Sequence, residues 1–464
     1  MTRTVSMTRG RPGVLPSPAR RAAFEALLAV ERGGFADEAL EQAAHDARVD
    51  RRDFALAQEL TYGVLRQRGM LDWRLAALAD RPLTRMSAAV LTALRLGAYQ
   101  LLVLSRIPAS AAVNESVLLV RGAAEAHAAG FVNAILRALP RTDPPVIPDL
   151  KTDPVDALAI RYSCPPWLVT RWVTRLGRVQ AEALCASTVE IPPLTVRVNS
   201  LRTTREQLLA AFAADGVAAQ PTAHSASGVL VEANRPVTEL PGFADGHFYI
   251  EDEGGQLVAP LLDPQPGERI LDACAAPGGK ATHLAMLMRN AGEIVAVDVD
   301  ARRLARVREN AERLGATIIQ PLQTDLTKPA AAALAAAYDR VLVDAPCSGL
   351  GVLRRHPEGK WQKRATALAR HQEKQLAILN AVVPALRPGG TLLYSTCSTE
   401  PEENELVIAR FCQAHPEFFR ESIAPWLPPA ACAFVTADGS FSTMSQQRTP
   451  SMDRFFAARL GKHA

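Results

Sequence analysis

The segment RILDACAAPGGKATHLAMLMRNAGEIVAVDVD (269–300) holds two apolar runs separated by a glycine-rich turn and a helical stretch. The runs RILDACAA and EIVAVDVD have the length and continuous hydrophobicity of strands buried on both faces of a sheet. One helix is expected to begin near Lys280, and a second near Ala301. Strand, helix and strand in this order predict a parallel βαβ unit.

The same alternation continues towards the C-terminus. Two further strands, IIQPLQTD and RVLVDAP, are followed by a long helix and by a final apolar strand, GTLLYSTC. An alanine-rich helix is expected near residues 330–337. Repeated βα units predict an α/β fold with a doubly wound, parallel sheet over residues 263–464.

Three other regions precede this domain. Apolar residues recur at helical spacing from Pro18 to Leu139, which predicts an all-helical domain over residues 17–145. Five prolines within 140–156 predict a linker, and the polar stretch 1–16 is expected to be a disordered tail. Between the linker and the sheet, the strands PLTVRVNSL, GVLVEA and HFYIED and the capped helix TTREQLLAAFAADG predict a small α/β module over 155–262.

Charge and cysteine usage narrow the class of protein. Of 464 residues, 48% are hydrophobic and 22% charged, which is typical of a globular chain. Residues 1–145 contain 19 Arg, no Lys and 14 acidic residues, a net charge of +5 that favours a nucleic-acid partner, although arginine is frequent throughout the chain. Seven cysteines without a CxxC pair predict neither a structural metal nor a disulfide framework. With no signal-like apolar segment or membrane span, we expect a cytoplasmic protein. We also expect it to act as a monomer.

Acidic residues follow four successive predicted strands, where ligands bind in parallel sheets. They are Asp272, Asp298, Asp325 and Asp344. The loop after the first strand consists mostly of small residues, two of them glycines, and it leads into a helix. Free N–H groups at the start of that helix can bind an anionic group. The residues of this loop are Cys274, Ala275, Ala276, Pro277, Gly278, Gly279 and Lys280. A single aspartate is more often a cap or turn residue, but four in succession, with Asp298 placed to bind ribose hydroxyls, predict a nucleoside site. The loop lacks the GxGxxG order of dinucleotide binders.

Two cysteines follow the last two predicted parallel strands. Cys347 follows Asp344, and Cys397 follows Tyr394, each at an offset of three residues. If these strands are neighbours, about 5 Å apart, both thiols can face one small substrate. Spacing alone does not decide which of them is a nucleophile.

Three segments together resemble the signatures of a known family. DACAAPGGKATHLA, VDAPCSGLGVLRRHPEGKW and YSTCSTEPEENE are similar to those of the Sun/Fmu (RsmB-type) family of bacterial 16S rRNA cytosine-C5 methyltransferases, and the N-terminal helices resemble its NusB-like RNA-binding domain. The resemblance implies a Rossmann-like methyltransferase domain, S-adenosylmethionine as cofactor and small-subunit ribosomal RNA as partner. It further implies that Cys274–Lys280, Asp298, Asp325 and Asp344 line the cofactor site.

The resemblance also implies a covalent mechanism. C5 of cytosine is too poor a nucleophile to take a methyl group unaided, so Cys397 would add to C6, Asp344 would hold the polar edge of the ring, and Cys347 would assist proton removal or release. Two alternatives remain: an RNA-binding assembly factor with a vestigial methyltransferase fold, and a DNA cytosine methyltransferase in which Cys347 attacks. The second would need a large target-recognition insert, which is absent.

Other residues carry weaker expectations. The Cys347 loop is followed by Arg354, Arg355, His356 and Lys360, which could contact RNA phosphates, with Trp361 stacking on them or packing beneath. From the residues alone, a solvated turn over a core Trp361 is an equal alternative, and the resemblance favours the contact with RNA. Helix capping is expected of Glu402, Glu403 and Glu405. Arg197 and Asn199 look like ordinary strand residues of the small module, which by resemblance helps to grip RNA. Arg454 stands where the family is expected to have glycine, which puts the local shape of the final hairpin in doubt.

Overall fold

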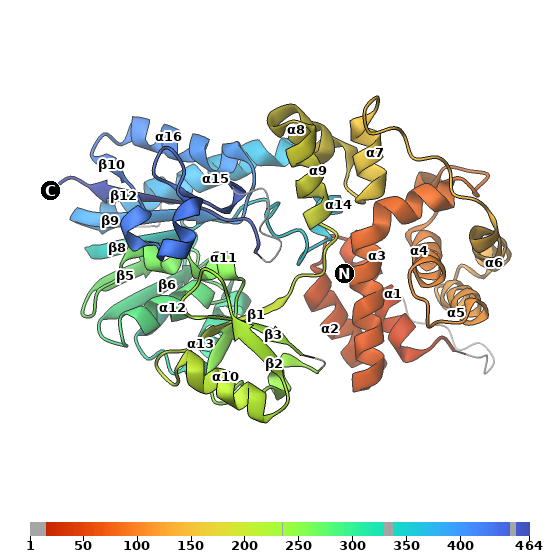
Figure 1. Cartoon of the computed structure of the whole chain (residues 1–464), viewed down its shortest axis with the longest axis horizontal. Coiled ribbons are helices and arrows are strands. Elements are labelled where there is room, and N and C mark those ends of the chain that lie inside the picture. The colour runs from red at the N-terminus through yellow and green to blue at the C-terminus, as the bar shows by residue number, and fades with distance from the viewer. Residues whose placement is uncertain (1–14, 234, 329–333, 335–336, 446–451) are drawn as a thin grey trace. The chain divides into compact units, whose positions relative to one another are not determined.

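The computed structural model describes the chain except residues 1–14, 234, 329–333, 335–336 and 446–451. Almost all of the expected tail, and most of the expected alanine-rich helix, lie outside the described residues. The chain divides into two compact units. Unit 1 comprises residues 1–191 and 353–363, and unit 2 comprises residues 192–352 and 364–464 (Figure 1).

Unit 1 is helical, as predicted for its first part. Its first six α-helices are α1 (Pro18–Glu31), α2 (Ala36–Ala47), α3 (Arg51–Ala76), α4 (Ala88–Leu102), α5 (Ala109–Gly122) and α6 (Ala129–Ala138). The N-termini of α3 and α4 are capped by the side chains of Asp50 and Ser87, which accept the free backbone N–H groups of Asp53 and Val90. The apolar faces of these helices pack together in one core. This core includes Phe24, Leu27, Leu60, Leu94, Leu96, Val132 and Leu136.

Three further helices of unit 1 follow a stretch without helix or strand, residues 142–153. They are α7 (Pro154–Arg161), α8 (Pro166–Leu176) and α9 (Arg178–Ser187). The side chain of Asp153 caps α7, whose first residue is a proline. Residues 154–187 therefore add helices to unit 1 ahead of the small module.

The segment Leu353–Lys363 belongs to unit 1, although the residues before and after it belong to unit 2, and it includes the short helix α14 (Gly359–Gln362). Trp361 Nε1 donates to the Leu65 carbonyl at 3.0 Å, and Lys360 Nζ donates to the Arg66 carbonyl at 3.1 Å. Only 1% of Lys360 is exposed, and burial lowers its pKa. The expected contact of Lys360 with RNA phosphates is therefore wrong, because its ammonium group is enclosed by unit 1 itself.

Unit 2 begins with the small module. Its antiparallel sheet has the order β2-β3-β1-β4, from β1 (Leu194–Val198), β2 (Ala218–Pro221), β3 (Gly228–Glu232) and β4 (Phe248–Ile250). Helix α10 (Arg205–Ala214) starts with a capping box between Thr204 and Gln207, which fixes the start of the predicted helix. Val196, Val198, Phe212, Val229 and Phe248 form the module's own core.

The large sheet of unit 2 has the order β10-β12-β9-β8-β5-β6-β7, with β11 paired to β12. Its strands are β5 (Arg269–Asp272), β6 (Glu293–Asp298), β7 (Ile319–Gln323), β8 (Tyr338–Asp344), β9 (Leu386–Thr396), β10 (Phe418–Glu421), β11 (Phe441–Ser442) and β12 (Phe456–Lys462). The five strands from β9 to β7 are parallel, as predicted, whereas β12 and β10 extend the sheet in antiparallel pairing.

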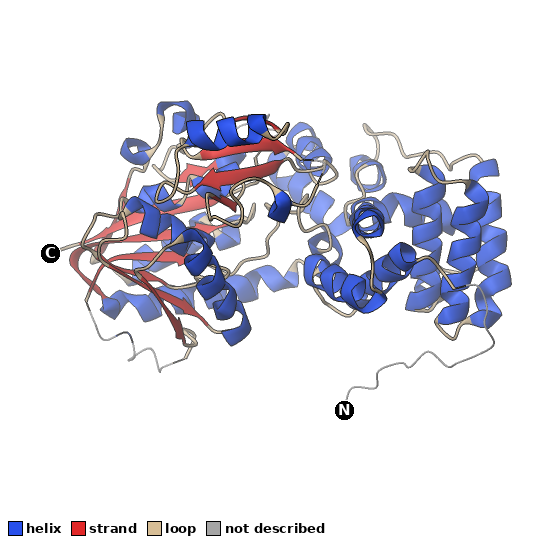
Figure 2. Cartoon of the chain, turned by 90° about the horizontal axis from the view of Figure 1, so that it is seen from below, coloured by secondary structure: helices blue, strands red, loops and turns tan. Residues whose placement is uncertain are grey.

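Helices cover both faces of this sheet (Figure 2). On one face, α15 (Thr366–Val382) and α16 (Glu405–Ala414) share a core with sheet residues such as Leu271 and Val341. On the other, α12 (Gly279–Leu287) packs on residues that alternate with them, such as Ile270 and Leu342, and α13 (Ala301–Leu314) packs there too. The doubly wound prediction is confirmed. Within the described residues, no helix has both the length and the apolar character needed to cross a membrane.

Candidate active site

The four aspartates lie along one edge of the large sheet. Asp344, Asp272 and Asp298 are the last residues of β8, β5 and β6, and Asp325 comes two residues after β7. These strands are adjacent and parallel, so their carboxyl ends meet at the same edge. The structure thus brings together the strand ends that the sequence singles out.

The loop between β5 and α12 is fixed by its backbone. Ala275 N–H donates to the Val297 carbonyl at 2.8 Å, and Gly278 N–H donates to the Ala275 carbonyl at 2.7 Å. Gly278 has φ +103°, and a Cβ there would lie 3.2 Å from Val307 Cα on α13. A side chain at this position would be strained and would push the loop away from α13. Small residues therefore let the backbone turn tightly at the sheet edge.

Lys280, at the start of α12, pairs with the carboxylate that ends β8. Its Nζ lies 2.6 Å from Asp344 Oδ2. Burial alone would lower the pKa of Lys280. The negative charges of Asp344 and Glu251 have the larger combined effect, so the pKa of Lys280 is raised above its usual value. Ser395 Oγ, on the adjacent strand, donates to Asp344 Oδ1 at 2.7 Å. Both oxygens of Asp344 therefore have fixed partners and a fixed direction.

Asp272 is completely buried in the middle of this edge. Burial and the neighbouring charge of Asp344 raise the pKa of Asp272 to about 7, and Lys280 and the Cys274 N–H offset only part of that rise. Neither of its oxygens makes a hydrogen bond of normal geometry within the described residues. A buried, unsatisfied carboxyl group is costly to a fold and indicates a place for a ligand's donor. Burial, followed by the charge of Asp272, also raises the pKa of Cys274.

The two remaining carboxylates differ in their surroundings. Asp298 is 8% exposed, and its Oδ1 accepts a hydrogen bond from the Asp300 N–H at 3.0 Å. Asp325 is half-buried, and its Oδ1 accepts from both the N–H (3.0 Å) and the hydroxyl (2.6 Å) of Thr327. These two hydrogen bonds are the main reason why the pKa of Asp325 is lowered. The contacts of Asp325 are those of a turn, whereas Asp298 keeps a carboxylate oxygen without a protein donor among the described residues.

Arg197 is a residue whose importance the sequence analysis missed. It is fully buried in β1, its guanidinium pairs with Glu251, and it donates to the Gly279 carbonyl at 2.7 Å. Its other terminal nitrogen donates to Thr282 Oγ1 at 2.9 Å. The small module thus supports the loop at the start of α12 through one arginine. The available signal was an arginine at a buried position of an apolar strand, where an unpaired charge is not tolerated.

The two cysteines meet as the strand pairing predicts. β8 and β9 are neighbours, with Asp344 opposite Ser395. The sulfur atoms of Cys347 and Cys397 lie 3.3 Å apart, and both side chains are half-buried. Their contact with each other, together with burial, raises the pKa of Cys347 well above its usual value. Cys347 therefore keeps its proton at neutral pH and can donate it towards the Cys397 sulfur.

Glu403 joins the two cysteine loops. It is fully buried, and its carboxylate accepts hydrogen bonds from Ser348 N–H at 2.7 Å, from Ser348 Oγ at 2.5 Å and from the hydroxyl of Ser398. Ser348 and Ser398 directly follow Cys347 and Cys397. The capping role expected of Glu403 is wrong: it lies in a 3-10 turn before α16, whose N-cap is Asn404. Its carboxylate instead fixes the distance between the thiols.

Arg454, noted as a departure from the family pattern, lies just before β12. Its backbone N–H donates to the Gly351 carbonyl at 2.9 Å, and its Nη1 donates to the Thr443 carbonyl at 2.8 Å. A Cβ on Gly351 would come within 2.3 Å of the Arg454 carbonyl oxygen. The loop that carries Cys347 therefore approaches this segment closely, and the arginine side chain is accommodated by its bond to Thr443.

Comparison with known proteins gives matches along most of the chain. Residues 259–461 match the family model "16S rRNA methyltransferase RsmB/F", residues 17–141 match "NusB family", and residues 164–238 match "Methyltr_RsmF/B-like, ferredoxin-like domain". The probable ribosomal RNA small subunit methyltransferase B of Synechocystis sp. is 35% identical, covering 96% of this chain and 99% of that protein. The protein of the same name from Bacillus subtilis is 37% identical over 90% of this chain and 93% of its own length.

A solved structure shares the fold over part of the chain. The crystal structure of NSun6 from Pyrococcus horikoshii with SFG, an S-adenosylmethionine analogue, has a TM-score of 0.56 and covers 65% of this chain and 98% of that one. It is 22% identical to this chain, so it supports the architecture alone.

Proposed function

Because this chain belongs to the RsmB/F family of 16S rRNA methyltransferases, we propose that Cys397, Cys347 and Asp344 carry out its reaction at the carboxyl edge of the large sheet. The chain is an S-adenosylmethionine-dependent enzyme that methylates C5 of a cytosine in 16S rRNA. The observation that carries the assignment of residues is the 3.3 Å approach of the two thiols beside the Lys280–Asp344 pair.

The residues at the sheet edge fit the cofactor. The loop Cys274–Lys280 would enclose it, Asp298 would accept from its ribose hydroxyls, and the buried Asp272 would accept from its ammonium group. Asp325 would lie at its adenine end, although its present partners are Thr327 and Lys328. Bound S-adenosylmethionine supplies an electrophilic methyl group at this edge.

The protein groups have distinct roles in the reaction. The Cys397 thiolate adds to C6 of the cytosine, which forms an S–C6 bond and moves the C5–C6 electron pair so that C5 becomes nucleophilic. Asp344, held by Lys280 and Ser395, would fix the polar edge of the ring. After C5 has gained the methyl group, the C5 proton leaves, the C5–C6 double bond reforms, and the S–C6 bond breaks to release the Cys397 thiolate.

Cys347 would serve the second half of this cycle. Its sulfur lies within hydrogen-bond reach of Cys397, so Cys347 can pass its proton to the departing Cys397 sulfur and take up the C5 proton in its place. Glu403 would keep both loops in register during these steps. We further propose that residues 17–145 recruit the RNA, that the small module of unit 2, formed by β1–β4 and α10, contributes contacts, and that the enzyme acts as a cytoplasmic monomer.

The decisive experiment compares the wild-type enzyme with Cys397→Ala and Cys347→Ala, using tritiated S-adenosylmethionine and unmodified 16S rRNA. We expect label at C5 of cytosine with the wild type and none with Cys397→Ala. With Cys347→Ala we expect an RNA–protein adduct that survives a denaturing gel. An adduct with Cys397→Ala but not with Cys347→Ala would reverse the two roles, and full activity of both variants would refute the covalent scheme.

A further inference from the structure

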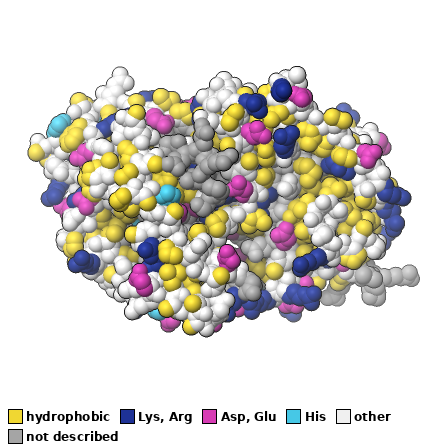
Figure 3. Space-filling model, in the orientation of Figure 1, with side chains coloured by type: hydrophobic (Ala, Val, Ile, Leu, Met, Phe, Trp, Pro, Cys, Tyr) yellow, Lys and Arg dark blue, Asp and Glu magenta, His cyan; other side chains and the backbone are white. Residues whose placement is uncertain are grey.

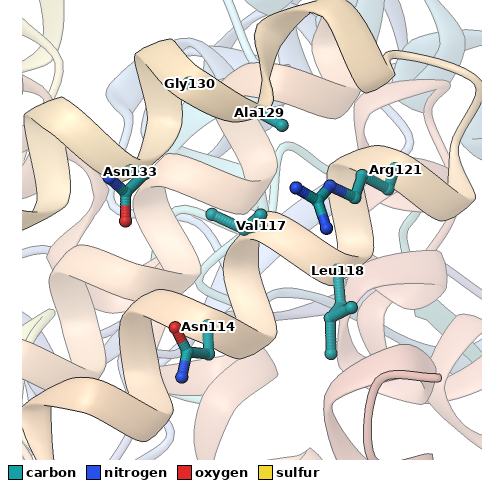
Figure 4. A pocket seen from close by; sticks show the side chains of 7 residues that line it. All are labelled: Asn114, Val117, Leu118, Arg121, Ala129, Gly130 and Asn133. Atoms are coloured by element: carbon teal, nitrogen blue, oxygen red, sulfur yellow. The ribbon is translucent and has the colours of Figure 1, made fainter. Parts of the chain in front are cut away.

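A hollow of about 460 Å³ lies between α5 and α6 of unit 1 (Figure 4). From α5 it is lined by Asn114, Val117, Leu118 and Arg121, which share one helix face at the spacing i, i+3, i+4, i+7. From α6 it is lined by Ala129, Gly130 and Asn133. Its volume is in the range of small-ligand pockets. Its walls combine a small apolar surface with three side chains that can form hydrogen bonds.

The polar groups of this hollow have unused hydrogen-bonding capacity. Within the described part of the chain, neither the Asn114 amide nor the Arg121 guanidinium has a hydrogen-bond or ion-pair partner. Asn133 Oδ1 accepts from Arg137 Nε at 2.9 Å, which leaves its NH₂ group free to donate. Figure 4 shows the Arg121 guanidinium pointing towards Val117, with Asn114 and Asn133 on the other side of that residue. Both amides and the guanidinium can therefore reach one ligand.

Gly130 leaves the hollow open. It lies in the first turn of α6, where glycine is less favourable than alanine by up to about 1 kcal/mol. A Cβ at this position would have no heavy atom within 4 Å. No close packing of the protein therefore calls for glycine here, and a larger side chain would occupy the space in front of α6.

The segment that forms the hollow carries a net positive charge, which favours an anionic ligand. Residues 106–141 contain four arginines and two glutamates. Figure 3 shows Lys and Arg side chains at the edge of the molecule where Figure 1 places α6. An unstacked nucleotide combines a flat base, whose edge amides can recognise, with a phosphate that arginine binds.

We propose that the hollow between α5 and α6 binds one unstacked nucleotide of the RNA substrate, an inference that rests on the proposed function. Asn114 and Asn133 hydrogen-bond to the edge of the base, the base covers Val117 and Leu118, and Arg121 pairs with the adjoining phosphate. The site gives the helical unit a preference for single-stranded RNA over a duplex, because a paired base cannot enter the hollow.

The test measures binding of the full-length enzyme to a fluorescent single-stranded RNA and to a duplex of the same length. Gly130→Trp fills the hollow and is expected to weaken single-strand binding about tenfold, with little effect on the duplex. Gly130→Ala is the matched control and is expected to bind as the wild type does. Thermal unfolding of both variants verifies that the fold is kept.

Arg121→Ala provides an independent variant at an exposed position. It is expected to weaken single-strand binding and to reduce the slope of log K against log salt by about 0.7. Arg52→Ala, which removes the same charge from an exposed position of α3, is its control. The proposal is overturned if Gly130→Trp binds single-stranded RNA normally, if single strand and duplex weaken equally, or if Arg52→Ala matches Arg121→Ala.

Failure of this proposal and failure of the proposed function have different signatures. If Gly130→Trp loses single-strand binding while wild-type enzyme transfers no methyl group to 16S rRNA, the nucleotide site stands and the reaction assignment falls. If methyl transfer depends on Cys397 but Gly130→Trp binds both RNAs normally, the reaction assignment stands and the hollow is not an RNA site.

Discussion

The sulfur atoms of Cys347 and Cys397 lie 3.3 Å apart, although the two residues are separated by 50 positions in the chain. This separation exceeds the S–S bond length by little more than 1 Å. Treatment with hydrogen peroxide should therefore oxidise the two thiols to one disulfide, with reduction of the peroxide to water. We expect loss of methyl transfer that dithiothreitol restores, and a cross-linked Cys347–Cys397 peptide by mass spectrometry.

The exposed thiol of Cys432 supplies the control for this prediction. Cys432→Ser should lose activity under peroxide as readily as the wild type. Inactivation that leaves both Cys347 and Cys397 open to alkylation would contradict the disulfide.

Glu403→Gln should impair turnover more than RNA binding. The glutamine still fits, but one oxygen that accepts from Ser348 and Ser398 becomes a donor, so the two cysteine loops lose their common acceptor. We expect kcat to fall by about tenfold or more with KM for RNA little changed. Glu405→Gln, at an exposed position of α16, is the matched control. Equal loss in both variants, or a change confined to KM, would argue against the positioning role.

Asp272→Asn should stabilise the unliganded protein at alkaline pH. The pKa of Asp272 is raised to about 7, so the folded state holds a proton that the unfolded chain releases near pH 4. The contribution of this group to stability therefore falls as pH rises from 4 to 7 and is most unfavourable above pH 7. Relative to the wild type, we expect Asp272→Asn to gain up to about 4 kcal/mol at pH 8.

At pH 4 the advantage of Asp272→Asn should largely disappear, because the carboxyl is then protonated in the folded state and about half protonated in the unfolded chain. Urea unfolding at the two pH values measures this difference. The same substitution should weaken binding of S-adenosylmethionine, as followed by calorimetry. A stability difference independent of pH would contradict the raised pKa.

Arg197→Met should destabilise unit 2 by about 3–5 kcal/mol, since it leaves the Glu251 carboxylate and the Gly279 carbonyl without their buried partner. Denaturant unfolding measures this loss, and cofactor affinity should fall with it because the start of α12 is released. Arg302→Met, at a side chain that is 94% exposed, is expected to change stability by less than about 0.5 kcal/mol. Comparable effects of the two substitutions would refute the role of Arg197.

The carboxyl edge of the sheet could be predicted because its residues follow strands directly in sequence. Once β5, β6 and β8 are recognised as parallel, their last residues must meet, and the same reasoning places Cys347 near Cys397. The antiparallel strands β10 and β12 carry no such regular βα pattern. Their place beside β9 was therefore not predicted.

Residues that act across long sequence distances could not be predicted. Arg197 supports Gly279, 82 positions away, and Lys360 binds a carbonyl 294 positions away. Such partners depend on tertiary packing, which local periodicity does not specify. Glu403 had a plausible local role in helix capping, and its actual contacts to Ser348 and Ser398 depend on the pairing of β8 with β9.

The segment Leu353–Lys363 limits how the two units can be separated by proteolysis or truncation. The polypeptide passes between the two compact units three times, after residues 191, 352 and 363. A single proteolytic nick near residue 191 would divide the chain into two polypeptides, but segment 353–363 of the second would still pack against helices of the first. A shortened gene beginning there would express Trp361 and the normally enclosed Lys360 without the helices that receive them, and we expect such a product to need a redesigned loop before it is stably soluble.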